Sequence, residues 1–360
     1  MIQRALRSIR RLYSDPPSLP STPVSEAYPS VSMHRLIDPV EVPTPETRDM
    51  SFNDFHSYVD APTYRSLPVR TALLEGVLFC PKNNVIMTPK RTVIQESAGP
   101  GAKTFHVDDD AALLHTDVSE PISGVSTALR CSFDNYYHFL VDNLSRFDLL
   151  NEEYFSQYEQ INLLCPGGLR PTEEYFVSKL CPSNVSIRNL EPNVLYRPEK
   201  YLFLSFPTRR SSGYIPGPFV SRLRKRILTE EAASRTRRLY ISRRKASHRR
   251  VRNEEALMRA LRSLGFRRYD LEDLPPKKQI LLFQEADLVV APHGAGLANL
   301  LFATGVTVVE LQASRNVAPH FYLLCKRLNH DYQYIPHGGT DVDSSFSTDP
   351  DEVMRHLPSL

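Results

Sequence analysis

Residues 287–312, DLVVAPHGAGLANLLFATGVTVVELQ, contain the stretch that decides the fold. An apolar run at 288–291 predicts a buried strand, and the tight Pro-His-Gly-Ala-Gly turn at 292–296 leads into an apolar helix at 297–303. A second apolar run at 306–311 predicts the next strand. Strand, glycine turn, helix and strand in this order are typical of a nucleotide-binding α/β domain, although an ordinary β-α-β turn has the same order.

The glycine turn has the chemistry that a phosphate group requires. Gly294 and Gly296 would let a phosphate approach the backbone closely, and the free N–H groups that open a helix favour negative charge. His293 and Ala295 complete the turn, where His293 could donate a hydrogen bond to a phosphate or a sugar. The carboxylate of Glu310, in the next strand, could accept hydrogen bonds from ribose hydroxyls.

Strands and helices alternate on both sides of this stretch. Apolar runs bounded by turn residues predict strands at 238–242, 266–269 and 331–335, and helical spacing predicts helices at 253–264, 275–286 and 319–328. The segment 207–218, PTRRSSGYIPGP, interrupts the pattern with prolines and glycines. We therefore place a domain boundary there and expect a Rossmann-like domain over residues 208–345.

A basic loop follows the first strand of that domain. In a doubly wound domain ligands collect at the carboxyl ends of the strands, so this loop, the glycine turn and Glu310 are expected to converge on one crevice. Arg243, Arg244 and Lys245 could then hold a pyrophosphate, because guanidinium forks match phosphate geometry. The alternative is a merely solvated basic loop.

Residues 69–207 are expected to form the first domain, an antiparallel element followed by alternating strands and helices. Within it, SFDNYYHFLVDNLSRF at 132–147 predicts a helix with one buried stripe. His138 and Asp142 lie four residues apart on another, exposed face, where such a pair suits proton abstraction. A surface pair that only ties the helix to a loop is the alternative.

The ends of the chain are expected to lie outside both domains. Residues 1–14 predict a short basic amphipathic helix, which could contact an anionic membrane or be a frayed tail. Residues 15–68 are rich in proline and predict a linker or an arm along the surface, and residues 346–360 a tail with a short helix. The acidic triplet at 108–110 could bind a metal, but it precedes a helix-like run whose start acidic residues favour.

Composition narrows the class of protein. The 360 residues carry a formal net charge of +3 and are 41% hydrophobic, which predicts a globular protein with a sizeable core. Five scattered cysteines without metal-ligand spacing indicate reduced thiols. No run approaches the roughly 20 apolar residues of a membrane-spanning helix, and no signal-peptide core opens the sequence. We therefore expect a cytoplasmic protein, which could contact the inner face of the membrane through residues 1–13.

Three segments together resemble glycosyltransferase family 61. They are NYYHFLVDNLSRF at 135–147, YISRRKASHRRVRNEEAL at 240–257 and ADLVVAPHGAGLANLLFATGVTVVEL at 286–311. The resemblance spans roughly residues 70–340 and looks most like microbial, capsular-polysaccharide-type members. It implies a GT-B-like α/β fold, with two Rossmann-like domains facing a cleft. It also implies an inverting transfer of a hexose or pentose from a nucleotide sugar, with uridine the family's usual base, to a glycan, lipid-linked saccharide or other hydroxyl acceptor.

The residues suggest how such a transfer would proceed. We expect Asp142 to be the base, with His138 orienting it or substituting for it, and the basic loop and glycine turn to hold the diphosphate without an essential metal or other cofactor. An inactive sugar-binding member of the same fold is one alternative. A nucleic-acid-binding protein is another, but aromatic residues are nearly absent from the basic segment, so no nucleic-acid partner is expected.

Overall fold

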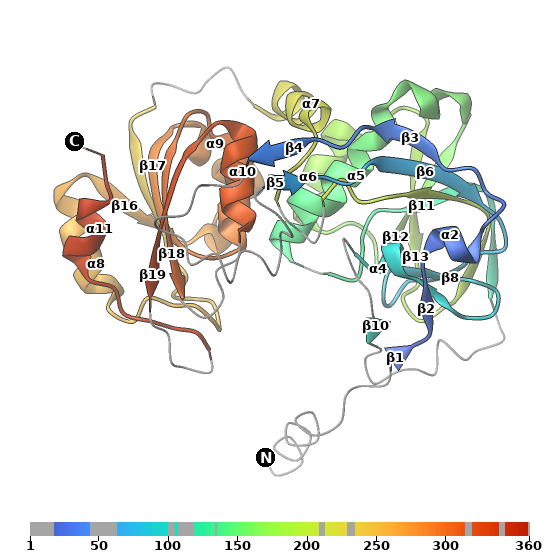
Figure 1. The fold of residues 1–360 in the computed structure, drawn as a ribbon, viewed down its shortest axis with the longest axis horizontal. Helices are drawn as coiled ribbons and strands as arrows, with labels where there is room; N and C mark the ends of the chain where they lie inside the picture. Colours follow the sequence, from blue (N-terminus) through green and yellow to red (C-terminus); the bar gives the residue numbers. More distant parts are fainter. Residues whose placement is uncertain are drawn as a thin grey trace, which may run out of the picture.

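A computed structural model describes residues 18–43, 63–99, 105–106, 119–133, 135–208, 213–228, 235–313, 319–337 and 343–358. The helix predicted at 1–14 and the acidic triplet at 108–110 lie outside these residues. The described chain forms two large sheets that lie side by side, with helices packed against each (Figure 1). This is the mixed α/β architecture that the sequence predicts.

The second sheet contains the fold-deciding stretch and is wholly parallel. Its five strands follow the order β16-β15-β17-β18-β19. They are β15 (Arg237–Ile241), β16 (Phe266–Tyr269), β17 (Ala286–Pro292), β18 (Thr307–Ala313) and β19 (Asp331–His337). Numbered along the chain, this is the doubly wound order 2-1-3-4-5. The order changes direction between β15 and β17, so the sheet has a topological switch point there.

Helices cover both faces of this sheet. α8 (Glu254–Ser263) and α11 (Pro350–Arg355) pack on one face. The other face carries α9 (Pro276–Gln284), the 3-10 helix η6 (Ala295–Phe302) and α10 (His320–Leu328). The predicted helices are present, but the one after the glycine turn is a 3-10 helix, buried almost throughout.

The first sheet has ten strands and is mixed. β13 (Val185–Leu190), β12 (Ile161–Pro166), β11 (Glu120–Ala128) and β14 (Tyr196–Leu204) are parallel neighbours in that order. In the antiparallel part, β6 (Val69–Leu74) and β7 (Leu78–Cys80) each pair with β14. β8 (Val85–Met87) and β9 (Val93–Ile94) follow β7 in the sheet, and the short helix α4 (Gln95–Ala98) follows β9 in the chain. Both the predicted antiparallel element and the predicted parallel alternation are therefore present.

This sheet begins earlier in the chain than residue 69. β2 (Ser21–Thr22) pairs with β9, and β3 (His34–Ile37) pairs antiparallel with β6. Between them α2 (Val24–Ala27) buries Val24 against the sheet. Two small ribbons pair β1 (Ser18–Leu19) with β10 (Phe105–His106), and β4 (Glu41–Pro43) with β5 (Thr63–Arg65). The proline-rich arm thus pairs with edge strands, where proline costs no central ladder bond.

Several helical segments connect and cover the first sheet. They are the π-helix η2 (His138–Asn143), α5 (Leu144–Asp148), the 3-10 helices η3 (Leu149–Asn151) and η4 (Glu153–Gln157), α6 (Pro171–Leu180), and α7 (Gly217–Ile227). α7 follows the chain's crossing from the first sheet toward the second (Figure 1). In the described part of the chain, no helix combines the length and apolar character needed to span a bilayer. All five cysteines carry free thiols.

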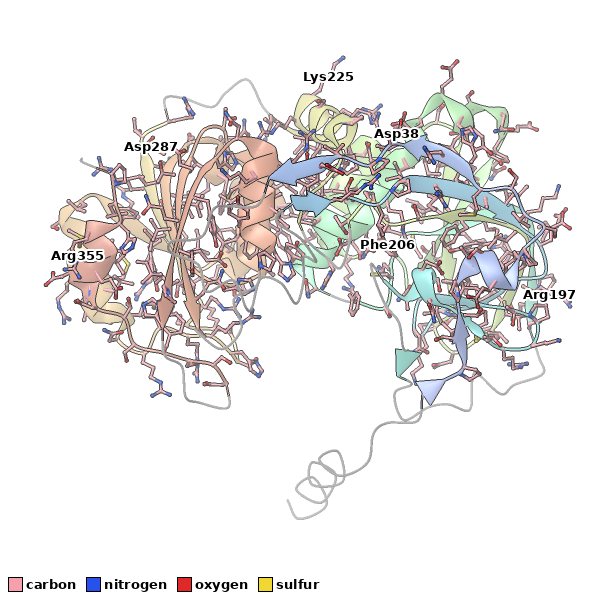
Figure 2. All side chains as sticks on the ribbon, viewed as in Figure 1. Asp38, Arg197, Phe206, Lys225, Asp287 and Arg355 are labelled. Carbon is pink, nitrogen blue, oxygen red and sulfur yellow. The ribbon has the colours of Figure 1, made fainter. Side chains whose placement is uncertain are left out.

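One apolar core joins the two sheets. It contains Leu140 and Leu144 near the first sheet, Phe219 of α7, and Leu300 and Phe302 of η6. The ring of Phe176 in α6 stacks on that of Phe302, with centroids 5.8 Å apart. Charged side chains such as those of Lys225, Asp287 and Arg355 lie on the periphery (Figure 2). The two sheets are therefore held together by a packed contact rather than by a linker alone.

Candidate active site

His138 and Asp142 lie on the π-helix η2, at the side of the first sheet that meets the second. The Leu144 N–H bonds to the Phe139 carbonyl, five residues back, which is the π pattern often found at functional sites. The Nδ1 of His138 lies 2.6 Å from Oδ2 of Asp142. Asp142 is 0% exposed, so the prediction of an exposed His–Asp face is wrong for the carboxylate. Packing between the two sheets covers the helix on nearly every side.

Both oxygens of Asp142 are occupied. Oδ2 faces His138, and Oδ1 accepts a hydrogen bond from the Thr208 hydroxyl, which is itself buried. The His138 side chain is 17% exposed and stacks on Phe133. Of this pair, only the imidazole can therefore reach a substrate. Thr208 is 66 residues from Asp142 in sequence, and no local pattern marks it.

A second histidine–carboxylate pair joins the glycine turn to the next strand. The Nδ1 of His293 lies 2.5 Å from Oε1 of Glu310. Oε2 of Glu310 accepts hydrogen bonds from the Tyr332 hydroxyl and from Nε2 of Gln312, the latter at 3.1 Å. Glu310 is 0% exposed. A role in holding ribose does not fit this environment, because the carboxylate has no contact with solvent and both its oxygens are already bonded.

The two pairs meet at one aromatic cluster between the sheets. The ring of Tyr137 lies 5.4 Å from that of His138 and 5.5 Å from that of His320, and His320 lies 6.1 Å from His293. Nearby, the Tyr136 hydroxyl donates to Oδ1 of Asn299 in η6 at 2.8 Å. The predicted helix and the predicted glycine turn, about 150 residues apart in sequence, are thus brought together.

The three predicted cations of the basic loop have different partners. Arg244 forms a forked pair with Asp270, and Lys245 contacts both oxygens of Asp273, at 2.5 and 2.6 Å. These two contacts tie the loop to the turn after β16. Arg243 instead turns toward the glycines: a Cβ built on Gly294 would lie 1.9 Å from its Nη1. Arg243 and the glycine turn therefore converge, and Arg244 and Lys245 are held by carboxylates.

Arg249 joins Arg243 at this place. Arg249 has a left-handed backbone conformation, with φ at 58°, and its backbone N–H donates to the Asp343 carbonyl. Burial, and then the charge of Arg249, lower the pKa of Arg243 to about 10. Burial also lowers the pKa of Arg249. Within the described residues neither guanidinium is ion-paired, although Arg243 donates to the His248 carbonyl. The two half-buried cations therefore repel each other.

An anion between these two cations would relieve that repulsion. The first N–H groups of a helix lack partners inside the helix, and Ala295 and Gly296 open η6 directly after Gly294. The Arg243 guanidinium thus lies at the turn from which η6 begins. Arg249 is one of several arginines in the basic segment at 240–257, and no feature of the sequence distinguishes it from the others.

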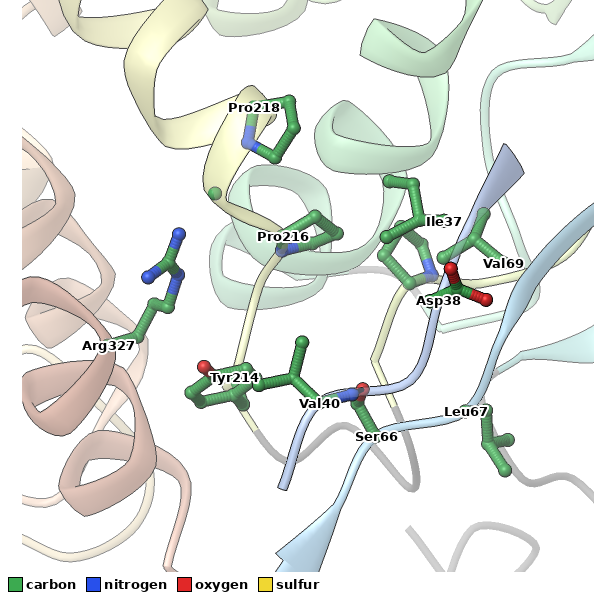
Figure 3. Close-up of a pocket in the computed structure, with 12 residues that line it drawn as sticks. Ile37, Asp38, Val40, Ser66, Leu67, Val69, Tyr214, Pro216, Pro218 and Arg327 are labelled. Atoms are coloured by element: carbon green, nitrogen blue, oxygen red, sulfur yellow. Dashed lines mark hydrogen bonds between the residues drawn. The ribbon is translucent and has the colours of Figure 1, made fainter. Parts of the chain in front are cut away.

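A larger cavity lies elsewhere. It has a volume of about 190 Å³ and lies where the N-terminal arm meets the segment that leads into α7 (Figure 3). Its walls include Val40, Tyr214, Pro216 and Pro218, and Arg327 of α10 lies over the Tyr214 ring. None of the predicted site residues lines it. We therefore locate the candidate active site at the smaller pocket beside Gly294.

Two comparisons relate the chain to known proteins. A search of curated proteins finds no match to the chain. The model of the family Glycosyltransferase 61 matches residues 136–309, a span that contains His138, Asp142, the basic loop and the glycine turn. Glu310 follows that span directly. The match shows that this part of the chain is similar to glycosyltransferase family 61.

Proposed function

We propose that the protein is an inverting, metal-independent glycosyltransferase that moves a hexose or pentose from a nucleotide sugar, UDP-linked in our expectation, to a hydroxyl acceptor. The observation that carries the proposal is that one aromatic cluster joins an accessible imidazole, backed by a buried carboxylate, to the glycine turn that the Arg243 guanidinium contacts. A proton acceptor and an anion site at one interface are what a displacement of diphosphate needs.

The donor diphosphate would lie against the glycine turn. Arg243 and Arg249 would bind its oxygens, and the N–H groups of Ala295 and Gly296 would supply further donors. His293, with Nδ1 committed to Glu310, would present Nε2 to a phosphate or to the sugar. Two fixed cations beside a helix start would then neutralise the departing charge without a metal ion.

His138 is the residue that we assign as the base. The acceptor hydroxyl attacks C1 of the sugar, the bond from C1 to the diphosphate oxygen breaks, and the hydroxyl proton moves to Nε2 of His138. Asp142 accepts the hydrogen bond from Nδ1 and stabilises the imidazolium that forms, and Thr208 fixes the carboxylate. Asp142 is too deeply buried to touch the acceptor, so its role is to position the base.

The domain roles follow from this chemistry. The part that carries His138, residues 69–207 with the N-terminal arm, would bind the acceptor. Residues 208–345 would bind the donor in a GT-B-like arrangement. The acceptor would be a glycan or lipid-linked saccharide of polysaccharide biosynthesis, handled in a microbial cytoplasm, with residues 1–13 as a possible contact to the membrane.

Two measurements test the proposal. Thermal stabilisation by a panel of nucleotide sugars identifies the donor, because a ligand that binds only the native state raises its melting temperature. Transfer, or hydrolysis of that donor, is then measured for His138→Ala, Asp142→Asn and the control His356→Ala. We expect the first two variants to lose activity by about 10²-fold or more, because each removes the base or its orientation, while donor affinity changes little.

The outcome that contradicts the assignment is equally specific. Loss of donor binding in both variants, in step with the loss of activity, would mean that the pair holds the donor rather than the acceptor proton. Donor binding without any transfer or hydrolysis in the unmodified protein would favour an inactive member of the family. Nucleic-acid binding is disfavoured because Arg244, Lys245 and Arg250 are already paired with carboxylates.

A further inference from the structure

A small pocket lies at the switch point of the second sheet. It opens at the carboxyl ends of three neighbouring strands, which is where ligands bind in doubly wound sheets. Its volume is about 30 Å³. The residues that matter for its chemistry come from β15, from the turn after β16 and from the turn after β17: they are Ile241, Arg243, Leu271, Glu272, Gly294 and Gly296.

Two glycines form walls of the pocket where a side chain would press on its neighbours. A Cβ on Gly294 would meet the Arg243 guanidinium, and one on Gly296 would lie 3.0 Å from Cδ1 of Leu271. The φ of Gly294 is 174°, an extended value open to any residue, so a larger residue there would cost space and not backbone strain. The pocket is therefore bounded where the glycine turn meets the side chains of Arg243 and Leu271.

Most charged side chains around the pocket form ion pairs, but two do not. Asp270 is bound by Arg244, and Asp273 by Lys245, so neither carboxylate is available to a ligand. Glu272 lies between them in sequence, yet among the described residues it makes no hydrogen bond and no ion pair. The carboxylate of Glu272 and the guanidinium of Arg243 both line the pocket. Arg243 donates to the His248 carbonyl but forms no ion pair among the described residues.

We propose that this pocket binds the ribose of a ribonucleoside diphosphate, with Glu272 accepting hydrogen bonds from the ribose hydroxyls while Arg243 binds the adjacent phosphate. The inference rests on the proposed function and assigns to Glu272 the role that buried Glu310 cannot have. The volume is about that of one water molecule in the liquid. Only hydroxyl groups fit such a space, so the ribose hydroxyls would enter the pocket while the ribose ring and the nucleobase lie outside it.

The two oxygens of a carboxylate match the two neighbouring hydroxyls of ribose. Each hydroxyl donates, and an ionised carboxylate only accepts, so the donor and acceptor roles agree. A hydrogen bond to a charged group is also stronger than one between neutral groups. A ligand that lacks the 2′-hydroxyl would leave part of this carboxylate unpaired, so the pocket should distinguish ribose from deoxyribose.

Isothermal titration calorimetry on the full chain tests the proposal. The ligands are UDP, ADP, GDP and CDP, their 2′-deoxy counterparts, and inorganic diphosphate, at one fixed salt concentration. For the best ribonucleotide we expect the unmodified protein to bind about tenfold more tightly than its 2′-deoxy form. Glu272→Ala should weaken the ribonucleotide by a similar factor and leave the 2′-deoxy form and inorganic diphosphate nearly unchanged.

Asp273→Asn is the matched control, because it removes one carboxylate from the same turn without touching the pocket. It should preserve the preference for ribose. If Glu272→Ala weakens the ribose and deoxyribose ligands equally, or strengthens both by removing negative charge, the role of Glu272 is overturned while nucleotide binding stands. If the unmodified protein binds none of the nucleotides, the proposed function itself fails.

Discussion

Arg243 and Lys245 are separated by one residue, yet they face opposite surroundings. Lys245 is 44% exposed and contacts a carboxylate, whereas Arg243 is half-buried against the glycine turn. A charged group that already has a partner contributes little to the affinity for a ligand, and an exposed ion pair contributes little to the stability of the protein. The chemistry of the basic loop is therefore concentrated in Arg243 and Arg249.

This difference yields a prediction at the scale of single residues. Arg243→Ala should weaken binding of the nucleotide-sugar donor by about tenfold or more, because a charge-assisted bond to the diphosphate is lost. Lys245→Ala should change donor affinity less than about threefold, since exposed pairs are weak. Donor titrations by calorimetry compare the two variants. Equal losses would show that net charge, rather than placement, controls binding.

At the scale of elements, the contact between α10, η6 and β19 depends on a buried imidazole. His330 follows α10, and its Nε2 lies 3.1 Å from the Leu300 carbonyl in η6. Burial lowers the pKa of His330 to about 4. The same helix presents His320 and Phe321 to His293, so the site depends on how α10 is held. A protonated His330 would loosen that support.

The stability of the protein should therefore depend on pH through His330. A histidine in the unfolded chain takes up a proton near pH 6.5, whereas the pKa of His330 in the folded protein is about 4. Protonation between pH 6.5 and 4 therefore favours the unfolded state, and the folded state is most stable above pH 6.5. As pH falls from 6.5 to 4, this residue should remove up to about 3 kcal/mol of unfolding free energy. Urea unfolding of the unmodified protein and of His330→Gln, each at pH 7 and at pH 4.5, measures this loss of unfolding free energy.

The unmodified protein should lose more stability than His330→Gln over that pH range. Other groups titrate in both proteins, so the difference between the two proteins isolates His330. Parallel losses in the two proteins would contradict the assignment.

At the scale of the whole molecule, the two sheets share one core across the region that carries the site. Phe302 at the end of η6 is fully buried and stacks on Phe176 of α6, so it belongs to both halves at once. Phe139 of η2, the helix that carries His138, also lies beside the Phe176 ring, with centroids 6.1 Å apart. Packing that joins the sheets thus also holds the base and the anion site at a fixed separation.

A shared core predicts cooperative unfolding. Phe302→Ala should lower the free energy of unfolding by about 3–5 kcal/mol, and the unmodified protein should unfold in one calorimetric transition. Phe79→Ala is the control of equal size, because Phe79 is also 0% exposed but packs only within the first sheet's own core. Two separate transitions, of which Phe302→Ala shifts only one, would show that the sheets unfold independently.

Sequence alone was sufficient wherever the signal was local. The strand at 266–269 has the predicted bounds. The helix predicted at 253–264 is longer than α8 by one residue at each end, and that at 319–328 is longer than α10 by one residue at its start. The agreement is close because apolar period and end signals act over a few neighbouring residues. The same locality placed His138 beside Asp142 and Gly294 at the end of a strand. The segments of the candidate site were all predictable in this sense.

The tertiary structure decided which of those side chains are free. It buried Asp142 and Glu310, paired Arg244 and Lys245, and brought Thr208 to a carboxylate 66 residues away. It also placed β3 beside β6 in a segment whose prolines predicted no sheet. Periodicity and motifs fix what a residue can do, but its partners lie far along the chain and are determined only when the sheets pack.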